Sequence, residues 1–238
     1  MEILKDYSEV VEARIKMKAE KISFIDNRII KLLRRFKLIN NIEIGDLNKS
    51  WDILHFINFV KNNVKKNESI LDIGCYKSEF IISLNALSYN NLSGIDLNQD
   101  ITRMPANKNI NYLLGNFMNF DFKEKTFKVI SAISVIEHGF DKNRFLESMS
   151  RIMQNDGYLL ISFDYWPDKI DTSKTKLFNM EWNIFSKSEV QDLITTAKKY
   201  NLLPINELNY SASKKAITHV GYDYTFGLII FKKNNDYQ

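Results

Sequence analysis

This 238-residue sequence contains only one cysteine and lacks a long hydrophobic run, and each shortage excludes a class of protein. The lone Cys75 cannot form a disulfide within the chain, and without companions it cannot supply a thiolate cage for a metal ion. Apolar residues never continue unbroken for the roughly 18 positions that a membrane-crossing helix needs. The first six residues are charged and mixed, unlike the start of a signal peptide. We therefore expect a cytoplasmic protein without a disulfide, a metal site or a membrane span.

Basic residues exceed acidic residues only slightly, 33 against 29, which gives a formal net charge of +4. This excess is compatible with an anionic partner but does not require one. Arg34, Arg35 and Lys37 form a basic cluster beside Phe36, and such a cluster could contact RNA. Cations are also favourable in the last turn of a helix, and the chain has no separate nucleic-acid module. We therefore do not expect a nucleic-acid partner; the sequence is compatible with a homodimer.

The chain is long enough for one α/β domain with an appendage. Between residues 7 and 38, apolar positions recur at three- and four-residue steps, a pattern that predicts a helix. Its expected apolar face comprises Ile22, Ile25, Ile29, Leu32 and Phe36. Ser50 can cap a second helix. We expect residues 1–50 to form an N-terminal helical extension that could act as a lid, and residues 51–238 to form the main domain.

After residue 68, short apolar runs alternate with helix-like segments, the pattern of a parallel sheet with crossover connections. The five predicted strands are Ser69 to Ile73, Leu92 to Ile95, Ile110 to Leu114, Val129 to Ser134 and Tyr158 to Phe163. Residues 165–185 lack clean periodicity and are predicted to form a long ordered loop. A capping box at residues 186–189 predicts a further helix. Two final strands, near Leu203 to Ser211 and Tyr224 to Lys232, are expected to pair as an antiparallel hairpin.

Polar residues end three successive predicted strands. Asp72 and Gly74 end the first, at the edge where open α/β sheets bind their ligands. Asp96 ends the second strand about twenty residues further on, where a carboxylate can accept both hydroxyls of a ribose. Asn116 and Phe117 follow the third strand and offer an amide and an aromatic face to an adenine. Together the three strand ends suit an adenosine.

The fourth predicted strand runs into Ser134-Val135-Ile136-Glu137-His138. With this segment added to Leu-Asp-Ile-Gly-Cys, Gly-Ile-Asp-Leu and Gly-Asn-Phe, residues 65–165 resemble the class I S-adenosylmethionine-dependent methyltransferases. The resemblance implies a doubly wound, Rossmann-like α/β fold. Its seven-stranded sheet would have the order 3-2-1-4-5-7-6, with the last strand antiparallel. S-adenosylmethionine is the implied cofactor and S-adenosylhomocysteine the implied product. The implied cofactor-binding residues are Asp72, Gly74, Cys75, Asp96, Leu97, Asn116, Phe117 and Ser134.

Tyr76 and Ser78 stand where this family usually has more glycines. The missing glycines argue against a pyrophosphate-containing cofactor. They also leave a catalytically silent adenosine-binding module as an alternative.

The acceptor side offers fewer signals. His138 follows a strand whose end should face the methyl group, and a histidine of near-neutral pKa can take a proton from an attacking hydroxyl or amine. We interpret it as the general base, the alternative being a histidine that only shapes the pocket. Glu137 is expected to support the following helix. Tyr165, Trp166 and Trp182 are predicted to form an aromatic platform for the acceptor, unless they only seal the loop.

The compact, aromatic enclosing segments favour a small-molecule acceptor, one that contains a sugar or a related metabolite. The alternative is an RNA or protein methyltransferase, for which the basic cluster at residues 34–37 is the sequence support.

Overall fold

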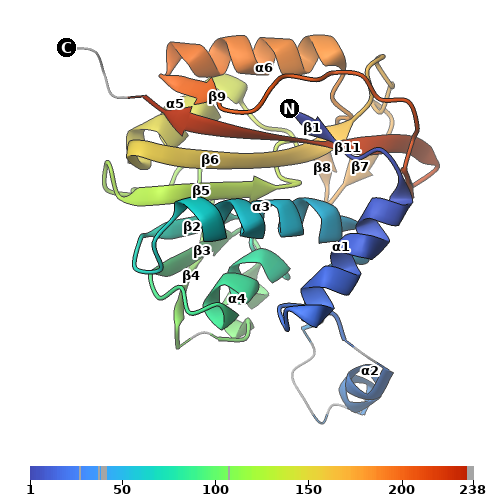
Figure 1. Ribbon diagram of the computed structural model, residues 1–238, viewed down its shortest axis with the longest axis vertical. Helices are drawn as coiled ribbons and strands as arrows, with labels where there is room; N and C mark the ends of the chain where they lie inside the picture. Colours follow the sequence, from blue (N-terminus) through green and yellow to red (C-terminus); the bar gives the residue numbers. More distant parts are fainter. Residues whose placement is uncertain (27, 37, 39–41, 107, 235–238) are drawn as a thin grey trace.

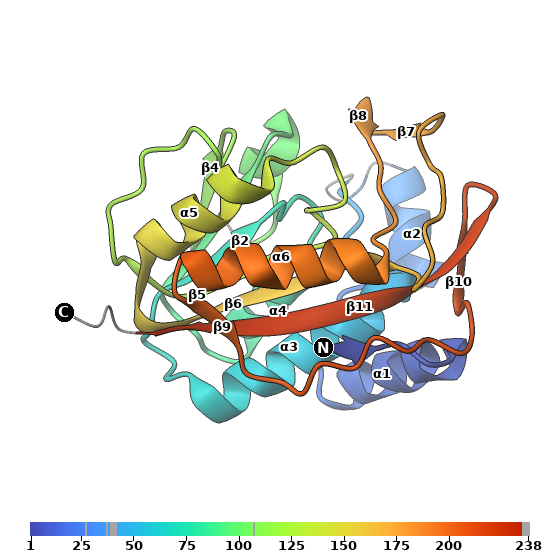
Figure 2. The same ribbon diagram turned by 90° about the horizontal axis from the view of Figure 1, so that it is seen from above.

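The computed structural model describes residues 1–26, 28–36, 38, 42–106 and 108–234 (Figure 1). These residues build one central sheet of nine strands with helices on both faces (Figure 2). The strand bounds are β1 Glu2–Ile3, β2 Ile70–Ile73, β3 Leu92–Asp96, β4 Ile110–Leu114, β5 Phe127–Ile133, β6 Met153–Tyr165, β9 Leu202–Pro204, β10 Ile217–His219 and β11 Tyr222–Lys233.

The five strands predicted to be parallel are confirmed. Strand β2 pairs in parallel with β3 and β5, β3 pairs with β4, and β5 pairs with β6. Strand β2 is buried along its whole length, as expected for a continuous apolar run covered on both faces of a sheet. Strand β6 begins earlier than predicted, because the expected turn at residues 155–157 is an irregularity within the strand. There Asp156 has a φ of 58°, and the register of β5 against β6 shifts between Phe127 and Val129.

The far edge of the sheet differs from the prediction. Strand β11 is antiparallel to β6, but the predicted strand near Leu203 to Ser211 is only the three-residue β9. The tight hairpin partner of β11 is instead β10, through a turn at Val220 and Gly221, where both φ values are positive. The N-terminal strand β1, which the periodicity did not predict, also pairs with β11. The sheet order is β1-β11-β6-β5-β2-β3-β4, so β1 and β9 share the edge at which a single sixth strand was expected.

Helices cover the two faces of the sheet in separate layers (Figure 2). One layer holds α1 Tyr7–Ala19, α3 Ser50–Asn63 and α4 Glu79–Ala86, and the other holds α5 Lys142–Ile152 and α6 Lys187–Lys199. Each layer has its own buried apolar cluster against the sheet. The predicted capping box at α6 is confirmed: the Ser186 hydroxyl and the Glu189 carboxylate each accept from the other residue's backbone N–H.

The N-terminal extension is broken in two, contrary to the single helical face expected from the sequence. Helix α1 ends at Ala19, Lys21 adopts a φ of 59°, and a separate helix α2 spans Arg28–Arg35. Ile22 is buried, but the side chains of Ile29, Leu32 and Phe36 are 69%, 52% and 65% exposed. The regular spacing of apolar residues therefore continues across the interruption between α1 and α2. Of the residues with this spacing, only those at the start pack on the domain. In the predicted basic cluster, Arg34 binds Asp26, and Lys37 lies outside the described residues.

Residues 165–185 contain a short hairpin rather than a loop without secondary structure. Strands β7 Lys176–Leu177 and β8 Met180–Glu181 pair antiparallel, joined by Phe178 and Asn179 at positive φ. Figure 2 shows this hairpin standing out from the sheet.

A buried ion pair joins the N-terminal helix α1 to helix α4. Arg14 of α1 donates to the Glu79 carboxylate at the start of α4, at 2.7 Å, and both side chains are at most 5% exposed. Arg14 also donates to the hydroxyls of Ser50 and Ser23 at 3.0 and 2.9 Å. One guanidinium thus joins α1, α3 and α4.

Replacement of Arg14 with alanine is expected to lower the free energy of unfolding by about 3–5 kcal/mol, because it leaves the Glu79 carboxylate buried without its cation. Denaturation in urea would measure this loss. The matched control is Lys61→Ala, which removes an exposed pair with Glu20 and should cost about 1 kcal/mol or less. Equal effects of the two substitutions would contradict the interpretation.

Candidate functional site

The turn after β2 requires a residue without a side chain. Gly74 has a φ of +69°, a conformation that L residues rarely adopt, and its backbone N–H donates to the Ile95 carbonyl at 2.9 Å. A Cβ at this position would lie 2.6 Å from Cγ2 of Val135. The turn therefore brings β2 directly against the segment that follows β5, and the backbone of Gly74 faces solvent.

Asp72 lies beneath this turn and is almost fully buried. Its Oδ1 accepts a hydrogen bond of 2.7 Å from Ser131, whereas Oδ2 has no hydrogen-bond partner among the described residues. Burial raises the pKa of Asp72 to about 7. A buried carboxylate with a spare oxygen beside an open glycine turn fits a cationic ligand group.

This raised pKa predicts how stability depends on pH. Because the folded protein holds the Asp72 proton more tightly than the unfolded chain does, the stabilisation is complete below about pH 4 and is lost as pH rises through about 7. We expect the free energy of unfolding of the ligand-free protein to fall across this window, with Asp72 contributing at most about 4 kcal/mol. Denaturation at several pH values should show a flatter profile for Asp72→Asn. A profile identical to that of the unsubstituted protein would refute the assignment.

Asp96 ends the neighbouring strand β3 and is held by backbone amides. Its Oδ2 accepts from Tyr76 N–H at 2.9 Å and its Oδ1 accepts from Asn98 N–H at 2.8 Å. The carboxylate is partly exposed, and Leu97 beside it is exposed. Two fixed N–H donors orient Asp96 toward the same sheet edge as the Gly74 turn, the geometry that a ribose diol requires.

The remaining predicted cofactor residues occupy varied positions. The Cys75 side chain is buried against Gly94, where a Cβ would lie 2.4 Å from its sulfur, so this residue can offer a ligand only its backbone. Asn116 is exposed, and its Oδ1 accepts from Met118 N–H at 2.9 Å. Phe117 is half-buried, with its ring edge-on to Phe145. Ser134 adopts a φ of +52° and its N–H donates to the Ser162 carbonyl at 3.0 Å, which fixes the end of β5 against β6.

Beyond Val135, the ends of β5 and β6 enclose buried charges that sequence reasoning did not bring together. Asp164 accepts a 2.8 Å hydrogen bond from the Trp182 indole, and Lys49 Nζ lies 3.7 Å from its Oδ1. The same ammonium lies 3.7 Å from the centre of the Phe226 ring. Burial alone would lower the pKa of Lys49, but the nearby carboxylates, Asp164 first, outweigh burial and raise it.

Glu137 belongs to this group and does not support the following helix as predicted. Helix α5 is capped by Asp141, whose carboxylate accepts from Arg144 N–H at 3.0 Å. Glu137 is instead 2% exposed, and its Oε2 has no hydrogen-bond partner within the part of the chain that the structure describes. Burial and, next, the Asp164 charge raise the pKa of Glu137 to about 8. Glu137 does not reach helix α5 because its side chain is buried in the turn between β5 and that helix.

Asp52, in the first turn of α3, completes the group. The Ser162 hydroxyl donates to its Oδ2 at 2.8 Å, and burial raises the pKa of Asp52 to about 6. We call Glu137, Asp164, Asp52 and Lys49 the carboxylate cage. Lys49 and Asp52 carry no motif, and only the packing of α3 across the sheet brings them to the ends of β5 and β6.

His138 follows Glu137 and borders the cage. Burial lowers the pKa of its imidazole, and its Nδ1 is buried with no hydrogen-bond partner among the placed residues. The ring stands edge-on to Phe178 of the β7–β8 turn, with 5.4 Å between centroids. His138 therefore carries a buried Nδ1 that no other described residue engages.

The three predicted platform aromatics do not share a surface. Tyr165 is wrong as an acceptor contact: its ring is fully buried on the α5–α6 face, and its hydroxyl donates to the Tyr210 carbonyl at 2.6 Å. Alternation along β6 places it opposite to Asp164. Trp182 is buried on the other face and is edge-on to Tyr222 and Tyr224. Trp166 is half-buried with Lys215 over its ring. The aromatic side chains around Trp182 therefore form one wall of the carboxylate cage.

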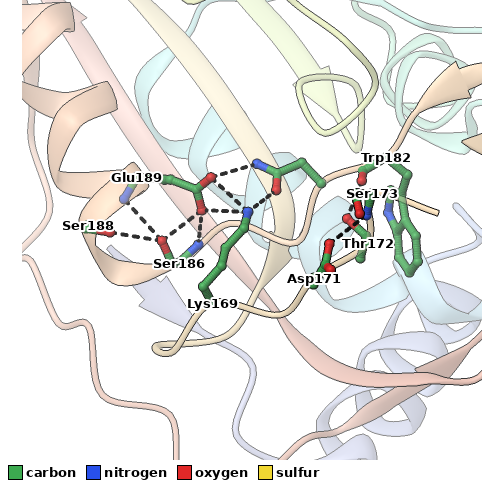
Figure 3. Close-up of polar contacts among 9 residues, drawn as sticks. Lys169, Asp171, Thr172, Ser173, Trp182, Ser186, Ser188 and Glu189 are labelled. Atoms are coloured by element: carbon green, nitrogen blue, oxygen red, sulfur yellow. Dashed lines mark hydrogen bonds and ion pairs between the residues drawn. The ribbon is translucent and has the colours of Figure 1, made fainter. Parts of the chain in front are cut away.

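A cavity of about 430 Å³ opens beside the cage. Glu137 and Trp182 line its inner side, and Phe140, Thr172, Asn183 and Phe185 are among its other walls. Figure 3 shows how the segment over this cavity is held: Lys169 binds the Glu189 carboxylate at 2.8 and 3.1 Å, while Ser173 N–H donates to Asp171 at 2.9 Å. Residues 169–189 are therefore an ordered wall of the cavity.

Among the residues that the structure places, no three His, Cys, Asp or Glu side chains come together so as to hold a metal ion. In the same described ranges, no helix combines the length and the apolar character needed to cross a bilayer.

The fold is that of a Rossmann-like α/β protein with carboxylates and a glycine turn at one edge of its parallel strands. The family model described as "Methyltransferase domain" matches residues 44–194, more than half of the sequence. The chain therefore belongs to this methyltransferase family, and it spans about three fifths of the length of the EEF1A lysine methyltransferase 2 proteins that it matches.

The chain is similar to curated relatives in sequence and to solved structures in fold. The chain is 27% identical over 144 residues to EEF1A lysine methyltransferase 2 of Danio rerio, an alignment that covers 52% of this chain and 62% of that protein. The fold is shared with the 1,6-didemethyltoxoflavin-N1-methyltransferase of Burkholderia thailandensis, a structure with S-adenosylhomocysteine bound (TM-score 0.56, 13% identity, 77% and 79% of the two chains). It is shared as well with a Listeria monocytogenes protein described as an S-adenosylmethionine-dependent methyltransferase (TM-score 0.58, 13% identity, 77% and 99%).

Proposed function

We propose that this protein is an S-adenosylmethionine-dependent methyltransferase whose compact acceptor group enters the cavity lined by Glu137, the residue before His138. The observation that carries the proposal is the contact between Gly74 and Val135, because it makes the cofactor turn adjoin the segment that leads to Glu137 and His138. The methyl group of a cofactor bound at the sheet edge and an acceptor bound in the cavity would then approach each other beside Val135. Transfer by direct displacement needs little more than this alignment.

The residues present fit the cofactor. We assign the methionine part to Asp72, Gly74 and the backbone of Cys75, and the ribose to Asp96 beside Leu97. Asn116 and Phe117 are assigned to the adenine, and Ser134 to the floor. The spare Oδ2 of Asp72 and the absence of a side chain at Gly74 are the structural support. When bound, S-adenosylmethionine supplies an electrophilic methyl group on a positively charged sulfur.

His138 is assigned the role of general base. Its lowered pKa keeps the imidazole neutral, and its free Nδ1 can accept the proton that the acceptor loses. Trp166 and Trp182 are assigned to the walls that enclose the acceptor, the first by its partial exposure and the second by its place in the cavity lining.

Two acceptor classes compete for this cavity. A sugar-containing small molecule was the expectation, but it relied on an aromatic platform that the burial of Tyr165 removes. The Danio rerio relative is named for a lysine of a protein, and the Burkholderia thailandensis enzyme for a ring nitrogen of a small molecule. A cavity of about 430 Å³ can accommodate either a group of a small molecule or a slender side chain of a protein substrate.

Calorimetry with S-adenosylmethionine and S-adenosylhomocysteine tests the cofactor site, and transfer of a labelled methyl group to a panel of metabolites and peptides tests turnover. We expect both ligands to bind at one site and label to reach at least one acceptor. Binding without transfer to any acceptor would support the silent module instead.

A further inference from the structure

The carboxylate cage already holds one ammonium group, that of Lys49. This side chain is 19% exposed and extends inward from the turn before α3 to place Nζ between Asp164 and the Phe226 ring. A carboxylate on one side and an aromatic face on the other are the two groups that recognise an alkylammonium ion. The cage is therefore chemically an amine-binding site.

The cage has more carboxyl groups than the single Lys49 ammonium can pair with. Glu137, Asp164 and Asp52 are all at most 5% exposed, and Lys49 is the cation facing them in the described structure. Glu137 in addition leaves Oε2 without a partner while its side chain lines the cavity of about 430 Å³. A buried acceptor oxygen of this kind is costly unless a donor reaches it. An ammonium group that enters from the cavity in the place of Lys49 would supply three donors.

We propose that the methyl acceptor is a primary or secondary amine on a slender stem, whose ammonium binds Glu137 and Asp164 in the place that Lys49 fills when no acceptor is bound. The proposal rests on the proposed methyltransferase function and deepens it by naming the acceptor nitrogen. Lys49 can withdraw because its four-carbon stem is flexible and reaches the surface. An alcohol or a sugar hydroxyl has no charge with which to compete against the Lys49 ammonium.

The chemistry balances with the groups present. The bound ammonium gives one proton to Nδ1 of His138, and the freed lone pair attacks the methyl carbon. The N–C bond forms as the S–C bond breaks, and the S–C electron pair stays on sulfur as the neutral thioether of S-adenosylhomocysteine. The product is an N-methylated ammonium ion that the same carboxylates can hold until release.

The test uses the gap that Lys49→Ala would leave. This substitution removes three methylenes and an ammonium, the equivalent of n-propylammonium. We expect millimolar n-propylammonium chloride to raise the melting temperature of Lys49→Ala by several degrees, and n-propanol at equal concentration to have no such effect. The double variant Lys49→Ala with Glu137→Gln should lose the response, and Lys61→Ala, an exposed control, should never show it. Equal responses to amine and alcohol, or a response that survives Glu137→Gln, would overturn the proposal.

Transfer provides the second readout. With labelled S-adenosylmethionine, Lys49→Ala should methylate n-propylamine at least tenfold faster than the unsubstituted enzyme does, and should leave n-propanol unlabelled. If Lys49→Ala does not fold, Glu137→Gln alone should raise the KM of any amine found in the acceptor panel at least tenfold and leave the cofactor Kd unchanged. Label on hydroxyl acceptors alone would reject the amine while upholding the methyltransferase. Failure of the unsubstituted protein to bind S-adenosylmethionine would instead reject the proposed function.

Discussion

Replacement of Asp96 with alanine is expected to weaken S-adenosylmethionine binding about 100-fold or more. The reason is that in the proposed site Asp96 offers two carboxylate oxygens to the ribose diol, and hydrogen bonds to a charged group contribute about 1.5–3 kcal/mol each. The N–H groups of Tyr76 and Asn98 already orient this side chain, so little conformational entropy is lost when it binds the ribose. Calorimetry on the purified variant measures the change.

Two further variants distinguish a loss of ribose binding from a disturbance of the loop that carries Asp96. Asp96→Asn keeps the shape and one acceptor oxygen, so its affinity should fall between those of the other two proteins. Asp100→Ala removes an exposed carboxylate that binds Arg103 at 3.0 Å on the same segment, and it should bind the cofactor normally. Normal binding by Asp96→Ala would disprove the ribose assignment, and so would an equal loss in Asp100→Ala.

The second large effect is expected at His138. Replacement with alanine should lower kcat about 100-fold or more, the range of a positioned general base, while the Kd of the cofactor stays unchanged. In the unsubstituted enzyme the rate should rise with pH through the lowered pKa of His138 and then level, and this rise should vanish in the variant. The rate of label transfer against pH measures both effects.

The control for His138 is another histidine of the chain. His55→Ala removes a partly exposed imidazole on α3 that lies 2.9 Å from Glu2, away from the cavity, and should leave kcat unaltered. If His138→Ala turns over at the full rate, the imidazole only shapes the wall beside Phe178 and the base must be sought elsewhere. Glu137, whose pKa near 8 also allows it to carry a proton, is then the next group to substitute.

Local signals predicted the cofactor half of the molecule well. Short apolar runs predicted the five parallel strands, and the acids and glycine at their ends indicated the sheet edge at which we propose that the cofactor binds. These features are readable because strand and turn each depend on a few neighbouring residues. The capping box at Ser186 was readable for the same reason.

The acceptor half was predicted less well, since its residues meet only through packing. Tyr165 and Trp182 are both aromatic residues near the end of β6, yet they lie on opposite faces of the sheet. Lys49 and Asp52 lie more than 80 residues from Glu137 in the sequence, and α3 brings them together. The apolar period of residues 22–36 crossed a helix break that no proline or glycine marked.

By itself the sequence determined a parallel α/β sheet, the order of acids at its ligand edge and a histidine after the fourth strand, because each follows from periodicity and spacing within short segments. Only the tertiary structure decided that β1 closes the sheet edge, that Glu137 points inward and that one lysine ammonium sits among buried carboxylates. The physical reason is that burial, which sets the charge and pKa of each of these groups, is a property of the surroundings assembled by distant segments.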